Sequence, residues 1–422
     1  MANQFSKEER VAFEMLLEGF YDQLVLSRNV SIYSTDQVTM ERTADVIWRP
    51  QPYIVSSFDG TDQTNNFKDQ TQLAVPATIG FSKSVPWVLT AKELRDALQE
   101  QRLGASAKTR LASDINLAIS NVAGLQGTLV IKRTTAASGF DDVALCDSIM
   151  NEQGVQYGDR YLGLSSRDYN GMASNLQVAS RSFDGQKSVT AYEKAYVGQV
   201  SGFETYKLDY ARRLTAALGS AITMDTRSTA NNFYIPRAFT TATTGEVGNV
   251  DNRYQTVTVN STTNVVAGDA FTIAGANAAH HITKADTGQL KTFRVISVGS
   301  GTTMVISPPI ISNQGGNVSE AQYQNVVVVP AAAAAVVWLN TVAANANPFW
   351  HKDALELIPG RYAVPTDAGT AVMRATTDQG IELVMQKFYD INTMKTKYRL
   401  DTLFGVVNKQ PEMTGIILFN QT

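Results

Sequence analysis

The chain has 422 residues, of which 44% are hydrophobic and 18% are charged, and its formal net charge at pH 7 is −3. Because a single core stops growing at roughly 250–300 residues, we expect more than one module. The hydrophobic content excludes a wholly disordered chain, and the near-neutral charge excludes a protein devoted to gripping nucleic acid.

The first predicted element is a helix that begins at a capping box formed by Ser6 and Glu9. Its apolar residues share one face: Phe13, Leu16, Leu17, Phe20 and Leu24. Glu14, Glu18 and Asp22 fall on the opposite face at spacings of four residues. This acidic stripe is either an ordinary solvated face or a docking stripe for a basic partner. Ahead of the helix there is no pattern of a secretory signal.

Residues 31–89 are predicted to be extended. Val46–Pro50 and Leu73–Phe81 are expected to form strands around the polar, turn-rich tip Phe58–Asn66. An isolated two-stranded ribbon is marginally stable in water, so we expect this arm to pack on another part of the structure, such as another subunit. Thr90 and Glu93 form a second capping box, which opens a long helix that should end by Gly124 or Gly127.

Residues 128–218 alternate between short strands and helices. One helix is expected to be capped by Asp141 or Asp142 and another by Ser165 or Ser166. From about residue 219 the chain becomes rich in Thr, Val, Gly and Asn, which predicts a small all-β barrel. Its expected strands are Tyr254–Val259, Ala270–Ala274, Phe293–Val298, Met304–Ile306 and Val326–Val329. Residues 345–422 return to the earlier mixed style, which indicates a β-domain inserted into an α+β host.

Residues that usually carry chemistry are scarce. Cys146 is the single cysteine and is expected to be a small buried hydrophobe. His280 and His281 are interpreted as a loop pair without function, and His351 as a packing or hydrogen-bonding residue. No phosphate loop, dinucleotide fingerprint, nucleophile elbow or zinc-protease motif is present in the sequence. We therefore predict no enzyme, no cofactor and no metal site. The longest apolar run is shorter than the ~20 residues of a membrane span, so no membrane partner is expected.

Several stretches resemble, in the same order, the coat proteins of phage P22 and its relatives. They are Ala44–Pro50, Gly127–Ile131, Val247–Val259, Gly268–Gly275 and Asn347–Ala354. The resemblance covers most of the chain and is strongest in residues 245–355. It implies the tailed-phage major capsid fold of the Hong Kong ninety-seven type, an α+β fold, with an inserted all-β barrel. The implied parts are an N-arm (1–45), an E-loop hairpin (46–89), a spine helix with peripheral domain (90–127), an axial domain (128–219), the inserted barrel (220–344) and a return to the axial and peripheral domains (345–422).

The function that this resemblance implies is self-assembly. Copies would form pentamers and hexamers of an icosahedral virion capsid that encloses double-stranded DNA without sequence-specific binding. A scaffolding protein would direct assembly in the host cytoplasm, and a portal protein would be a further partner. Two alternatives stay open: an encapsulin-like compartment shell, and a ligand-binding protein that uses the β-domain.

The resemblance also implies two contact sites. The family's scaffolding protein meets an acidic region of the N-arm, for which Glu14, Glu18 and Asp22 are the candidates. A loop of the inserted domain contacts a neighbouring capsomer, and residues 237–252 hold the matching position. That loop is neutral and rich in Thr here, so its candidate charged contacts are Glu246, Asp251 and Arg253. Asp251-Asn252-Arg253 is independently interpreted as a strand-entry turn with a local charge pair.

Overall fold

The computed structural model describes most of the chain. The described residues are 5, 7–33, 46–52, 54–55, 57, 59–64, 66–90, 92–93, 97–180, 197–225, 234–299, 301–363 and 370–422. They form two compact units. The first contains Met1–Ile47, Ala77–Ile119 and Leu355–Val407, and the second contains Trp48–Pro76, Ser120–Ala354 and Asn408–Thr422. Among the described helices, none combines the length and hydropathy needed to cross a membrane.

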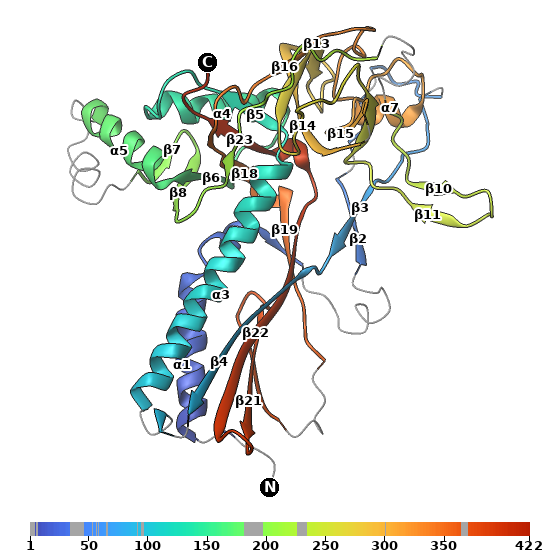
Figure 1. Cartoon of the computed structure of the whole chain (residues 1–422). Helices are drawn as coiled ribbons and strands as arrows, with labels where there is room; N and C mark the ends of the chain where they lie inside the picture. The colour runs from blue at the N-terminus through green and yellow to red at the C-terminus, as the bar shows by residue number, and fades with distance from the viewer. Residues whose placement is uncertain are drawn as a thin grey trace. The chain divides into compact units, whose positions relative to one another are not determined.

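The first unit pairs two helices with a twisted sheet (Figure 1). Its helices are α1 (Lys7–Gln23), the 3₁₀ turn η1 (Leu26–Asn29) and most of α3 (Ala97–Gln126). Its strands are β1 (Ser31–Ile32), β4 (Phe81–Thr90), β19 (Leu355–Pro359), β20 (Ala371–Thr376), β21 (Glu382–Asp390) and β22 (Lys395–Asn408). They run in the order β1-β19-β22-β21-β20, and β4 also pairs with β22.

The helices of this unit follow the sequence signals closely. Phe13 and Phe20 on α1 are buried, as the apolar face predicts. Gly104 lies where α1 and α3 approach, since a Cβ there would stand 3.4 Å from Leu16 Cδ1. The second capping box is confirmed: Thr90 N–H donates to the Glu93 carboxylate at 2.9 Å, and Glu93 N–H donates to Thr90 Oγ1 at 3.3 Å.

The second unit contains a six-stranded sheet in the order β5-β23-β18-β6-β8-β7. These strands are β5 (Leu129–Lys132), β6 (Arg160–Ser165), β7 (Gln199–Val200), β8 (Phe203–Leu208), β18 (Asn347–His351) and β23 (Thr414–Leu418). Helices α4 (Phe140–Glu152) and α5 (Ser166–Ser180) follow β5 and β6 in the chain. Cys146 is fully buried in the core they share, as expected.

A closed β-barrel forms the other half of this unit. Its sheet runs in the order β12-β15-β14-β13-β16, with β12 (Gln255–Thr258), β13 (Ala270–Ala279), β14 (Asp286–Val298), β15 (Thr303–Ser307) and β16 (Val336–Trp338). Residues 222–225 join the two edge strands. Met224 N–H donates to Ala334 O at 2.9 Å, and Asp225 N–H donates to Thr258 O at 3.0 Å. The barrel predicted from alternating hydrophobicity is therefore present.

One short strand pairing lies at the two ends of the barrel segment, and another forms a ribbon outside the barrel sheet. Strand β9 (Arg213–Leu214) pairs antiparallel with β17 (Ala344–Asn345), so the chain enters and leaves the barrel side by side. Strands β10 (Phe239–Thr241) and β11 (Val247–Asn249) form a separate ribbon. The predicted arm has its own ribbon of β2 (Val46–Pro50) and β3 (Ala74–Thr78).

Three sequence expectations are wrong in detail. Val326–Val329 is not a strand: Val326 makes one bridge to Ala278, where β13 is interrupted by register shifts. The barrel segment is not all-β, because it contains helix α7 (Val318–Tyr323). Helix α4 is capped by Gly139 rather than by Asp141 or Asp142, and Asp142 instead accepts N–H bonds from the preceding turn.

The expected N-caps of the other two helices have different outcomes. Ser165 does cap α5, because its Oγ accepts the Asp168 N–H at 3.3 Å. Ser6, the expected cap of α1, lies outside the described residues. Two short 3₁₀ turns, η4 (Lys352–Ala354) and η5 (Pro411–Met413), are also present.

Candidate functional site

The three residues of the predicted acidic stripe fall within the bounds of α1. Glu14 is exposed, on the side away from the buried Phe13 and Phe20. Glu18 and Asp22 occupy later turns of the same helix, and their side chains are outside the described part of the structure. The carboxylate of Glu9, by contrast, is used within the first unit. It pairs with Lys387 of β21 and accepts a 3.3 Å hydrogen bond from Tyr398.

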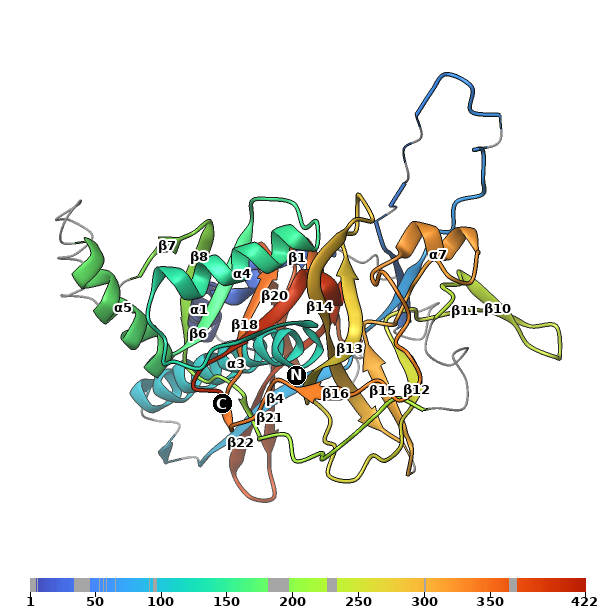
Figure 2. The ribbon, with the colours of Figure 1, turned by 90° about the horizontal axis from the view of Figure 1, so that it is seen from above.

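The loop predicted to reach a neighbour forms the β10–β11 ribbon, whose strand residues are all exposed. Phe239 retains 58% of its surface and Val247 retains 66%. Figure 2 shows the ribbon extending beyond the barrel strands. Within the described residues the ribbon is a two-stranded sheet with no third strand on either edge. Glu246, also exposed, lies at its turn. Apolar side chains and open strand edges are typical of a segment that another chain completes.

Asp251 and Arg253 are brought together with each other and not with Glu246. The Arg253 guanidinium donates to both Asp251 oxygens, with Nε–Oδ1 at 2.9 Å and Nη2–Oδ2 at 2.7 Å. Its Nη1 donates to Asn408 O at 2.9 Å, and only 8% of Arg253 is exposed. The expected local charge pair is therefore confirmed. Because both charges are satisfied inside the subunit, Glu246 remains the exposed charged candidate of this loop.

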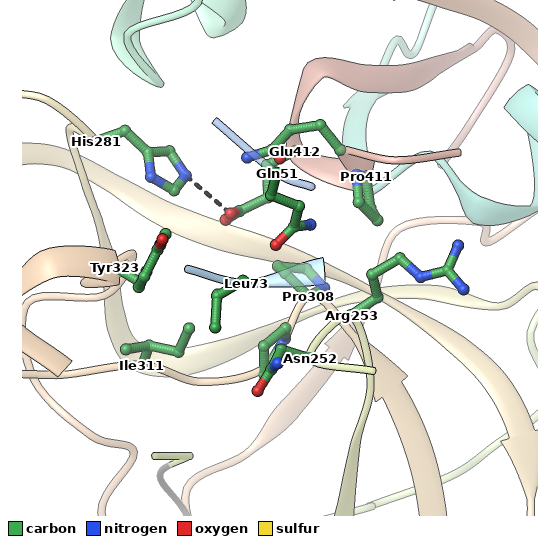
Figure 3. A pocket seen from close by; sticks show the side chains of 12 residues that line it. Gln51, Leu73, Asn252, Arg253, His281, Pro308, Ile311, Tyr323, Pro411 and Glu412 are labelled. Carbon is green, nitrogen blue, oxygen red and sulfur yellow. Dashed lines mark ion pairs between the residues drawn. The ribbon is translucent and has the colours of Figure 1, made fainter. Parts of the chain in front are cut away.

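A buried charge cluster lies where the barrel meets the C-terminal segment within the second unit (Figure 3). Glu412 Oε1 is 2.5 Å from Lys291 Nζ, and Glu412 Oε2 is 2.8 Å from His281 Nε2. Lys291, on β14, is 1% exposed. Burial alone would raise the pKa of the Glu412 carboxyl, but His281 and Lys291 more than offset that effect and hold it well below its ordinary value.

Neutral groups complete this cluster. Gln153, after α4, accepts a 2.6 Å hydrogen bond from Lys291 Nζ on its side-chain oxygen. Asn325 donates from Nδ2 to Glu412 Oε1 at 3.1 Å. The cluster thus connects the barrel with the end of α4 and with the turn η5, which precedes β23. The interpretation of His281 as a loop residue without function missed this contact. The burial of Lys291 could have been predicted from the sequence. Alternate residues of a strand lie on one face, and Lys291 shares its face with the buried Phe293 and Val295.

The pocket beside this cluster is small. Its lining includes Gln51, Leu73, His281, Tyr323 and Glu412, and its volume is about 40 Å³. That volume suits one or two waters and is far below the ~300–1,000 Å³ of small-molecule sites. Among the residues that the structure describes, no group of three or more His, Cys, Asp or Glu could hold a metal ion.

His351 behaves as the sequence predicts. His351 is 7% exposed, and its Nδ1 accepts the Asp353 N–H at 3.3 Å. Burial lowers the pKa of His351, with the nearby Asp353 acting in the opposite direction. His351 is thus buried and hydrogen-bonded within the second unit.

The family model described as P22 coat protein, gene protein 5, matches residues 1–420. A structure of Mycobacterium phage Che8 covers 94% of this chain and 92% of its own at 9% identity, with a TM-score of 0.44. A capsid structure of cyanophage P-SCSP1u covers 93% and 86% at 11% identity, with a TM-score of 0.42. The CUS-3 coat protein I-domain is 38% identical over 29% of this chain and 97% of its own, with a TM-score of 0.23. Since the family model spans almost the whole sequence, the chain belongs to the P22 coat protein family and is a major capsid protein of the bacteriophage virion, a structural protein that assembles into a shell and not an enzyme.

Proposed function

We propose that copies of this chain assemble as pentamers and hexamers into an icosahedral shell around the double-stranded DNA of a tailed phage. The observation that carries this proposal is the surplus of exposed apolar surface on its two ribbons. Phe67 on the arm is 86% exposed, and Phe239 and Val247 on the second ribbon are more than half exposed. Covering such side chains with another chain would remove apolar surface from water, which is favourable.

The near-neutral net charge of −3 supports an enclosing role rather than a DNA-gripping one, because phosphate binding scales with the number of cationic contacts. We propose assembly in the host cytoplasm with a portal protein as a further partner. We also propose the six-part division given above. The β9–β17 pairing supports placing an inserted barrel at residues 220–344, because the two connections lie next to each other.

A scaffolding protein is proposed to direct assembly through the acidic stripe of Glu14, Glu18 and Asp22. Glu14 is exposed on α1, so its carboxylate is available to a basic partner. Reversing all three charges to lysine should abolish scaffold-directed assembly while leaving the circular dichroism and thermal melt unchanged. Reversal of Glu204, an exposed carboxylate on β8, is the matched control. Normal shells from the triple variant would refute the stripe.

The β10–β11 ribbon is proposed to contact a neighbouring capsomer. Glu246 is its candidate charged contact, and the apolar Phe239 and Val247 supply area. Asp251 and Arg253 support this contact indirectly, because their mutual pair fixes the backbone that follows the ribbon.

The deciding experiment is sedimentation velocity with negative-stain electron microscopy on the purified chain, alone and co-expressed with its neighbouring phage genes. Closed shells that contain DNA are the expected result in the phage setting. Shells that enclose an enzyme and need no scaffold would instead indicate a compartment. A chain that stays monomeric in both samples would contradict the proposed assembly.

A further inference from the structure

The arm between β2 and β3 has little support along its length. Of its described residues, Val55 is 64% exposed and Phe67 is 86% exposed. Figure 2 shows the arm's trace leaving the neighbourhood of α7. Because an isolated two-stranded ribbon is marginally stable in water, the direction of this arm depends on what holds its base.

At the base, Thr71 is held by two neighbouring side chains of α7. Its N–H donates to Gln322 Oε1 at 3.1 Å, and its carbonyl oxygen accepts from Gln322 Nε2 at 3.3 Å. The same carbonyl accepts the Tyr323 hydroxyl at 2.7 Å. Gln322 and Tyr323 are only 4% and 6% exposed, so water competes poorly for these bonds. The glutamine amide thereby pairs with Thr71 as a neighbouring strand would.

Apolar packing strengthens the same base. Leu73 is 3% exposed and packs with Ile311 and Tyr323 of the barrel segment. The next residue, Ala74, forms a parallel bridge with Asp251, the partner of Arg253. On the other side of the arm, Gln51 donates from Nε2 to Lys409 O at 2.7 Å. Both sides of the base are thus tied to fixed backbone of the second unit.

Helix α7 is itself fixed in the barrel, although six residues form no stable helix alone. At its start, Glu320 accepts hydrogen bonds from the backbone N–H and side-chain amide of Asn317, at 3.4 and 3.0 Å. At its end, Lys284 Nζ donates to Gln322 O at 2.8 Å and to Gln324 O at 3.2 Å. The helix is therefore a rigid platform from which Gln322 and Tyr323 reach the arm.

We propose that Gln322 and Tyr323 are positioning residues, which hold Thr71 and so set the direction in which the arm leaves the barrel. The arm would then meet a neighbouring copy of the chain already oriented, and less ordering entropy would be lost when the subunits associate. This inference rests on the proposed assembly and gives the barrel a part in it. It concerns the arm of the same subunit, whereas the β10–β11 ribbon concerns contact with another capsomer.

The test measures arm direction and assembly separately in the full chain. Spin labels are placed at Thr61→Cys on the arm and Gln289→Cys on β14, both exposed positions. Native Cys146 is fully buried, and burial raises the pKa of its thiol, so it does not take the label. Electron-electron double resonance gives the label-to-label distance distribution in unassembled subunits. Light scattering after addition of scaffolding protein gives the assembly rate.

The test variant is Gln322→Met with Tyr323→Phe, which keeps the buried volume but removes the bonds to Thr71. Its control is Gln324→Met, a nearby glutamine whose amide donates to Val326 O inside the barrel segment. We expect the test variant to lose the narrow distance peak and to assemble roughly tenfold more slowly, with the control behaving as the parent. An unchanged distance peak, or a broadened peak with an unchanged rate, overturns the inference. If the parent itself forms no shells, the proposed function fails, while the distance peak still decides whether α7 sets the arm's direction.

Discussion

The barrel and the β10–β11 ribbon are both built from Thr- and Val-rich strands of one segment, yet they use their apolar residues in opposite ways. Phe271 of β13 is fully buried, and its ring lies 5.6 Å from those of Phe293 and Trp338. Phe239 of β10 is 58% exposed. The barrel completes its hydrogen bonding by closing on itself through residues 222–225, whereas the ribbon has no third strand among the described residues. The difference separates residues that stabilise the subunit from residues left exposed on its surface, which the proposed capsomer contact would cover.

The largest expected effect comes from matched truncations across this comparison. Phe271→Ala should lower the free energy of unfolding by about 3–5 kcal/mol, because it removes a fully packed ring and leaves a cavity. Phe239→Ala should change it by less than about 0.5 kcal/mol, as is usual for surface sites, while reducing the yield of shells. Urea unfolding and sedimentation of assembly reactions measure the two quantities. A strongly destabilised Phe239→Ala subunit would show that the ribbon belongs to the barrel's own core.

The next effect concerns the charge cluster that joins the barrel to the C-terminal segment. Lys291→Met should destabilise the subunit by about 3–5 kcal/mol, because Glu412 stays buried with one cation fewer. The double variant Lys291→Met with Glu412→Gln should recover much of that loss, since no uncompensated charge remains. The control is Lys397→Met, which removes a lysine that is 53% exposed in its pair with Asp390. Equal losses in the single and double variants would contradict this account.

Local patterns predicted much of this architecture. Alternation placed the strand at Tyr254–Val259 within a residue of β12, and the Thr90–Glu93 pattern marked the approach to α3. The strand expected at Val326–Val329 does not form: only Val326 bridges β13, which is irregular there, and Val328 is 45% exposed. Helix α7 was missed since its single turn and a half carries no helical periodicity that a window could detect.

The site was less predictable than the fold. Glu14, Glu18 and Asp22 could be placed on one helix from spacing alone, because the geometry is local. The contact between Thr71 and Gln322 spans 251 residues of sequence, and neither segment carries a pattern that predicts contact with the other. Asp251 and Arg253 were recognised as a local pair, but their burial against Asn408 depends on the fold and removes them from the outer surface. Contacts that depend on chain topology therefore stay invisible in a single sequence.

The smallest expected effect is a pH dependence of stability at Lys284. It tests whether this lysine holds helix α7 in place in the barrel segment. Burial lowers the pKa of Lys284 to about 8, with Lys291 adding to that effect and Glu412 opposing it. An unfolded lysine keeps its proton to about pH 10.4, so between pH 8 and 10 the unfolded state binds more protons than the folded state. The buried charge of Lys284 therefore lowers the stability of the subunit by its full amount below pH 8, and this loss is relieved as the pH rises.

Over this range, the free energy of unfolding of the parent should rise relative to that of Lys284→Gln by at most about 1.4 kcal/mol per pH unit. Lys284→Arg, which stays charged, should show no such gain, and parallel pH profiles for the parent and Lys284→Gln would mean that Lys284 is solvated and does not hold α7 in place.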